Sequence, residues 1–125
     1  MKAFLPMACA TALMTLPVYA ADCPYPQAPA KLPDGATATL EEMIAGQKAV
    51  QTYEKAINDY NACIDKGLEE QISKAGDQLK PEEKAKMQQL EAQKHNAAVD
   101  QLQSVADRFN EQVKIYKART ADKKG

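Results

Sequence analysis

Tryptophan is absent from the 125-residue chain, histidine occurs once, and only two phenylalanines and five glycines are present. The sequence also lacks the phosphate-binding loops, nucleophile elbows and zinc-binding helix motifs of common enzyme families. Adjacent carboxylates such as Glu69 and Glu70 point about 100° apart on a helix, so they do not share a site. The sequence therefore predicts a protein that is not an enzyme and has no cofactor.

A surplus of positive charge is missing too, because 16 basic residues oppose 17 acidic ones for a net charge of −1. This balance is not that of a general nucleic-acid binder, so no nucleic-acid partner is expected. Basic residues gather only near the C-terminus, at Lys114, Lys117, Arg119, Lys123 and Lys124. They indicate either contact with an anionic partner or favourable charge at a helix C-terminus followed by a soluble tail.

The one long apolar stretch, from Ala3 to Leu16, is too short for the roughly 20 residues of a bilayer span. It follows a lysine and precedes Pro17 and a small-residue cleavage site that ends at Ala20, as in a secretory signal peptide. We therefore expect residues 1–20 to be removed and the mature chain to have no transmembrane span. The protein is expected to be exported, to the periplasm by preference and to the extracellular space as the alternative.

Residues 21–38 are predicted to form an extended arm. Proline fixes φ and lacks a backbone donor, and prolines recur in this segment at Pro24, Pro26, Pro29 and Pro33. The sequence Pro33-Asp34-Gly35 predicts a turn in which the glycine supplies positive φ.

Two long helices are predicted after the arm, near 39–75 and 81–119. Thr39 and Glu42 have the spacing of a capping box, and Pro81 suits the first position of a helix. Apolar and small residues then repeat at heptad spacing in the first helix, at Met43, Gly46, Val50, Tyr53, Ile57, Tyr60, Ile64 and Gly67.

The short connection between the helices predicts an all-α fold, an antiparallel, coiled-coil-like hairpin over 39–119. Gly76 is expected to cap the first helix in the left-handed conformation. Residues 120–125 are expected to be a disordered tail.

A few residues lie on the apolar faces along which the two helices are expected to meet, called the seam below, and invite a functional interpretation. His95 has only Glu91 as a neighbour able to bind a metal, so a structural role is favoured and a metal partner is not expected. Tyr53 is expected to pack in the seam. Gly46 and Gly67 indicate close approach by the second helix or the arm, with a hinge as the alternative.

The apolar stripe of the second helix is the candidate interaction surface. Two paired helices of this length leave much of their flanks exposed, so self-association or docking on another envelope protein is expected to cover the stripe. The candidate residues are Leu90, Leu102, Val105, Phe109, Val113 and Tyr116.

Removal of the signal peptide would leave two cysteines, Cys23 and Cys63. An even number in an exported chain predicts one disulfide, whereas Asp22 before Cys23 makes lipid attachment a poor fit. The helix from Thr39 to Cys63 spans about 36 Å, and the arm can reach about 50 Å. We therefore predict an intramolecular Cys23–Cys63 disulfide that staples the arm to the first helix, with a bridge between two copies as the alternative.

Several short sequences resemble a family of small exported proteobacterial proteins. They include Cys23-Pro24-x-Pro26, Pro33-Asp34-Gly35-Ala36-Thr37-Ala38-Thr39, Asn96-Ala97-Ala98-Val99-Asp100 and Ala106-x-x-Phe109-Asn110. The resemblance covers nearly all of the predicted mature chain. It implies export and helices, and it supplies no activity.

A shorter segment, Leu79-Lys80-Pro81-Glu82-Glu83 followed by Met87-Gln88-Gln89-Leu90, is similar to a motif of the Spy-like periplasmic chaperones. Three functions follow as hypotheses. The first is a non-catalytic envelope protein that acts through protein–protein contacts, and the alternative is an ATP-independent periplasmic chaperone. A thiol or metal function is a third, and it requires a reactive Cys23 or Cys63.

Overall fold

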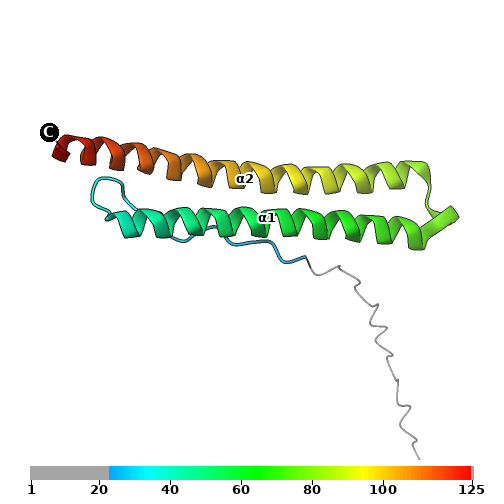
Figure 1. Ribbon diagram of the computed structural model, residues 1–125. Helices are drawn as coiled ribbons and strands as arrows, with labels where there is room; N and C mark the ends of the chain where they lie inside the picture. Colours follow the sequence, from blue (N-terminus) through cyan, green and yellow to red (C-terminus); the bar gives the residue numbers. More distant parts are fainter. Residues whose placement is uncertain (1–22, 125) are drawn as a thin grey trace, which may run out of the picture.

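The computed structural model describes residues 23–124 as a long two-helix hairpin with an extended arm (Figure 1). Helix α1 spans Leu40–Ala75 and helix α2 spans Pro81–Ala121. They run antiparallel and are joined by the short 3-10 turn η1, Gly76–Gln78. This confirms the predicted all-α hairpin. The predicted signal peptide, residues 1–20, lies outside the described residues.

The helix starts follow from the capping residues. The Thr39 hydroxyl accepts the Glu42 amide at 3.2 Å, and the Glu42 carboxylate accepts the Thr39 amide at 2.7 Å, which completes the predicted capping box. At α2 the carboxylate of Glu83 accepts the Lys80 amide at 3.1 Å, beside Pro81 at the first helical position. Gly76 has φ of 50° but ψ of −132°, so it supplies the expected positive φ outside the left-handed helical region.

The predicted disordered tail is wrong for residues 120–124. Helix α2 continues to Ala121, and a 3-10 turn, Asp122–Lys124, follows it. The Thr120 hydroxyl donates to the Tyr116 carbonyl at 2.9 Å, within this last part of the helix. Side-chain contacts between Arg119 and the arm hold the end of α2 in place, which is why the helix does not end where its polar sequence begins.

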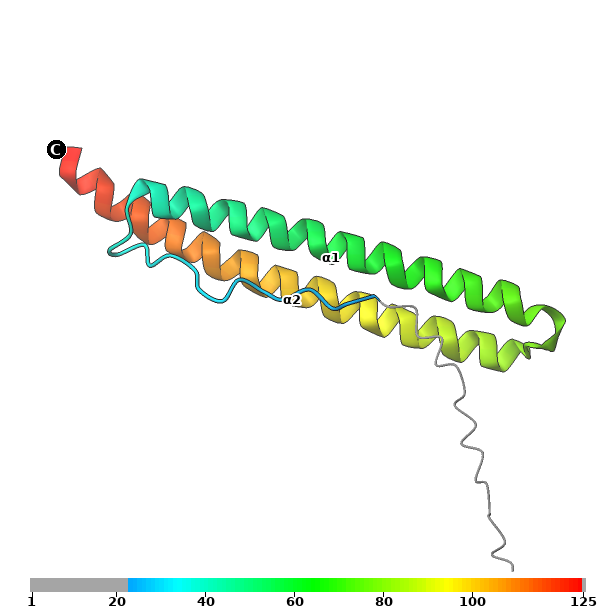
Figure 2. The same cartoon turned by 90° about the horizontal axis from the view of Figure 1, so that it is seen from below.

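The arm lies in the groove between the two helices. Figures 1 and 2 show residues 23–34 running back along the hairpin from the start of α1. Two clusters form the core. Ala28 packs on the first cluster, made by Tyr53, Ile57, Ala98 and Val105. Leu32 packs on the second, made by Ala38, Met43 and Phe109.

Gly46 is a point of close approach between the arm and α1. A Cβ at this position would lie 2.6 Å from the Pro33 ring and 2.9 Å from the Phe109 ring. Close approach by the arm therefore explains this glycine, and the hinge alternative is not needed there. Pro33 of the arm and Gly46 of α1 therefore form one packing contact.

Gly35 serves close packing as well, which corrects the expected reason for its presence. Among the described residues, only Gly76 has a positive φ. A Cβ at Gly35 would instead overlap the backbone carbonyl of Gln112 in α2. The turn itself is held by Asp34, whose carbonyl accepts the amides of Thr37 and Ala38 at 3.1 and 2.7 Å.

Candidate functional site

The N-terminal end of the arm is stapled to α1. Cys23 and Cys63 pair within one chain, with their Cα atoms 5.8 Å apart and a sequence separation of 40. That spacing lies in the ordinary range for a disulfide. Beside the staple, the ring of Tyr25 meets that of Tyr60 edge-on, with 5.1 Å between centroids. The structure thus pairs the two cysteines within one chain, as the predicted staple requires.

The other end of the arm is pinned to α2. The Arg119 guanidinium donates to the Gly35 carbonyl at 3.1 Å and to the Ala38 carbonyl, and it lies 5.2 Å from the centre of the Tyr116 ring. The Gln112 side chain accepts the Gly35 amide at 2.9 Å. Arg119 therefore has a structural role, although the sequence grouped it with the basic end of the chain.

The predicted interaction surface on α2 is mostly covered in the structure. Val105 and Phe109 are buried, and Leu102, Val113 and Tyr116 pack against the core clusters. The expectation of a free stripe is therefore wrong for Val105 and Phe109, whereas Leu102, Val113 and Tyr116 are half-buried. The arm lies between the helices and packs against both stripes. Leu90 is the exception, because 53% of its surface is exposed.

Leu90 belongs to the end of the hairpin that the described part of the arm, residues 23–38, does not reach (Figures 1 and 2). We call residues 64–94 the loop half. Within it only Gly67 is buried, and the large apolar side chains are half-buried or exposed. These side chains are Ile64, Leu68, Ile72, Leu79, Met87 and Leu90. The seam therefore continues past the staple without the cover that the arm gives the other half.

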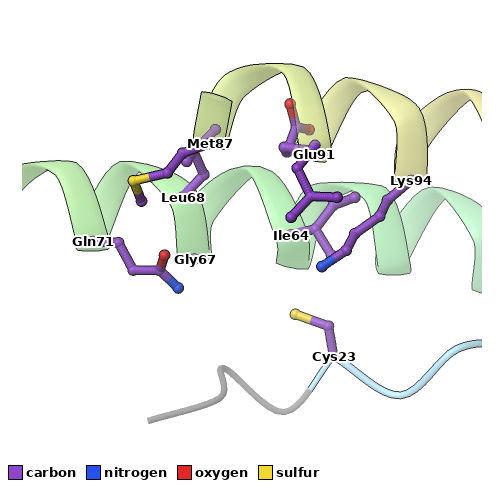
Figure 3. Close-up of a pocket in the computed structure, with 9 residues that line it drawn as sticks. Cys23, Ile64, Gly67, Leu68, Gln71, Met87, Glu91 and Lys94 are labelled. Atoms are coloured by element: carbon purple, nitrogen blue, oxygen red, sulfur yellow. The ribbon is translucent and has the colours of Figure 1, made fainter. Parts of the chain in front are cut away.

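A groove of about 220 Å³ opens in the loop half, next to the staple. Figure 3 shows its wall of apolar side chains from both helices, with polar side chains at the rim. It is lined by Cys23, Ile64, Gly67, Leu68, Gln71, Met87, Leu90, Glu91 and Lys94. The volume is below the roughly 300–1,000 Å³ of typical small-molecule sites, so a contact with a protein segment fits better than a small ligand.

A carboxyl pair crosses between the helices at the groove. A hydrogen bond with Asp65 raises the pKa of Glu91 above its ordinary value of 4.5, burial adds to this effect, and nearby His95 opposes it. His95 itself is half-buried on α2. No group of three or more histidine, cysteine, aspartate or glutamate side chains in residues 23–124 is arranged to hold a metal ion.

Two polar atoms are buried in the seam. The Tyr53 hydroxyl and the Asn61 side-chain oxygen have no hydrogen-bond partner among the described residues. Burial, and secondarily the nearby Tyr25, raises the pKa of Tyr53. Sequence reasoning missed Asn61, because it assigned the neighbouring Tyr60 to the seam. A buried asparagine in a helical seam favours one register over others, and Asn61 stands between the arm-covered half and the loop half.

Comparison with protein-family models, with curated proteins and with solved structures finds no match to the chain. The two resemblances noted in the sequence therefore stay predictions. None of the described helices combines the length and the apolar character that crossing a bilayer requires.

Proposed function

We propose that the protein is a non-catalytic helical protein of the cell envelope, acting through protein–protein contacts that the loop half makes. The observation that carries this proposal is the uneven cover of one continuous seam. The arm buries Phe109 and its neighbours, whereas Leu90 and Met87 continue the seam without such cover. An apolar surface left open beside a well-packed core is typical of an interaction site.

The proposed location is the periplasm. The features that support it are the cysteine pair, which is suited to an oxidising compartment, and the signal-like sequence before Cys23. The non-catalytic part of the proposal rests on the groove, whose walls are apolar and whose carboxyl pair lies at its edge. The basic C-terminal end is a weaker candidate for the contact, because Arg119 is used to hold the arm.

Site-directed photo-crosslinking in intact cells tests the proposal. A photoreactive amino acid at Leu90 is expected to form a covalent adduct with a partner protein. Val99 is the matched control, since it is also apolar and exposed on α2, at 42%, but lies outside the groove. An adduct that forms equally well from both positions, or from neither, would reject the loop half as the contact surface.

A holdase chaperone is the second candidate, for a specific reason. The segment that resembles Spy-like chaperones, residues 79–90, supplies Met87 and Leu90 to the groove. A flexible methionine suits a surface that accepts many clients. The mature protein is then expected to suppress aggregation of a denatured test protein without nucleotide, and Leu90→Glu to weaken suppression. Equal suppression by wild type and Leu90→Glu would count against this function at the groove.

A further inference from the structure

The arm shows what kind of segment this groove accepts. Residues 23–34 are extended, and the main-chain hydrogen bonds that tie the arm to its surroundings begin only at its turn. Ala28 and Leu32 enter the two core clusters from between the helices. Pro33 rests on Gly46, where a larger residue would collide with its ring. The arm-covered half is thus an established contact between a helical groove and a proline-rich segment.

The same groove continues beyond the staple. Cys23 ends the described arm and also lines the loop-half groove. Gly67, which lines that groove too, stands three heptads after Gly46, so the two glycines lie on the same face of α1. Ile64 and Leu68 provide the α1 wall, in line with the residues that the arm covers.

We propose that the loop-half groove binds an extended, proline-containing apolar segment of a partner protein, seated in line with the arm. This inference rests on the proposed function and names the chemistry of the partner. An extended proline-rich segment has no internal backbone hydrogen bonds, so its carbonyls and amides are free to pair with water or with polar side chains at the rim. Gln71, Glu91 and Lys94 line the groove and offer both donors and acceptors (Figure 3).

The arm itself supplies the probe. A fluorescent peptide with the sequence of residues 24–35 is titrated with the oxidised mature protein, and binding is followed by anisotropy. The control peptide has its four prolines replaced by alanine, which removes the preference for the extended form. We expect the proline peptide to bind several-fold more tightly than the alanine peptide, with a Kd below about 1 mM.

Two matched variants locate the binding. Leu90→Glu places a charge in the groove at an exposed position and is expected to weaken peptide binding about tenfold or more. Val99→Glu adds the same charge on α2 outside the groove and is expected to leave the affinity unchanged. Peptide binding that is equal in the two variants would place the site elsewhere and overturn the inference.

Two other results would also overturn it. The first is the absence of peptide binding at protein concentrations up to about 1 mM, which would mean a binding free energy weaker than about −4 kcal/mol. The second is a Leu90-dependent dimer in sedimentation equilibrium, which would make a second copy the occupant. A crosslink at Leu90 in cells combined with no peptide binding would leave the proposed function in place and remove this inference alone.

Discussion

Arg119 connects the end of α2 to the beginning of α1 through the arm. Its guanidinium donates to two backbone carbonyls and lies over the Tyr116 ring. Hydrogen bonds from a charged donor contribute about 1.5–3 kcal/mol. We expect Arg119→Ala to lower the free energy of unfolding by about 2 kcal/mol in urea denaturation. Arg108→Ala removes an exposed arginine of the same helix and is expected to change stability little. An equal loss of unfolding free energy in the two variants would show that Arg119 has no special role.

Glu91 gives the loop half a dependence on pH. Its pKa is raised in the folded state, so the stability that protonated Glu91 contributes is complete below about pH 4.5 and is lost as pH rises through the raised pKa. Glu91→Gln keeps the side chain neutral. At pH 7 it is expected to raise the melting temperature by about 1–3 °C relative to wild type, with no gain at pH 4.

The control for this pH effect is Glu69→Gln, which neutralises an exposed carboxylate of the loop half. It is expected to leave the difference between pH 4 and pH 7 as it is in the wild type. A Glu91→Gln variant that is less stable than wild type at pH 7 would show that the charged form of Glu91 is the one the fold favours.

At the scale of elements, the Cys23–Cys63 disulfide and the Arg119 hydrogen bonds hold the arm at its two ends. The disulfide closes a loop of 40 residues, which contributes on the order of 4 kcal/mol in the chain-entropy model. Replacing both Cys23 and Cys63 by serine is expected to lower the melting temperature by about 10–20 °C. Trypsin should then cut faster after Lys31, which lies exposed within the arm. Unchanged stability and unchanged cleavage would mean that apolar packing alone holds the arm.

The sequence was sufficient for the helices because their signals are local. Thr39 with Glu42, and Pro81 with Glu83, mark the two helix starts, and the heptad repeat marks the buried face of each helix. The staple could be predicted because only two cysteines follow the predicted signal peptide. The end of α2 could not be predicted from the sequence, because Arg119 is held by hydrogen bonds to residues more than 80 positions away.

The position of the arm between the two helices was beyond the sequence, and for the same reason the candidate surface included two residues, Val105 and Phe109, that are buried. A heptad repeat shows which face of a helix is buried but not what covers it. The arm lies between the helices, so Val105 and Phe109 belong to the core. Of the predicted surface, only Leu90 stays largely exposed, and the residues that join it in the groove, such as Met87 and Lys94, come from the part of the seam that the arm does not reach.

At the scale of the whole molecule, the hairpin consists of two halves of unequal packing. Ile57 and Val105 in the arm-covered half have no exposed surface, whereas no large side chain of the loop half is buried. Local opening costs least free energy where few apolar contacts must break. The half that is proposed to bind a partner is therefore also the half that should open more readily.

Native-state hydrogen exchange measured by mass spectrometry on the oxidised mature protein tests this division most directly. We expect amides of residues 68–75 and 81–92 to exchange substantially faster than those of residues 50–61 and 98–113, because the arm covers only the second set. Equal protection along the whole hairpin, or stronger protection in the loop half, would contradict the account.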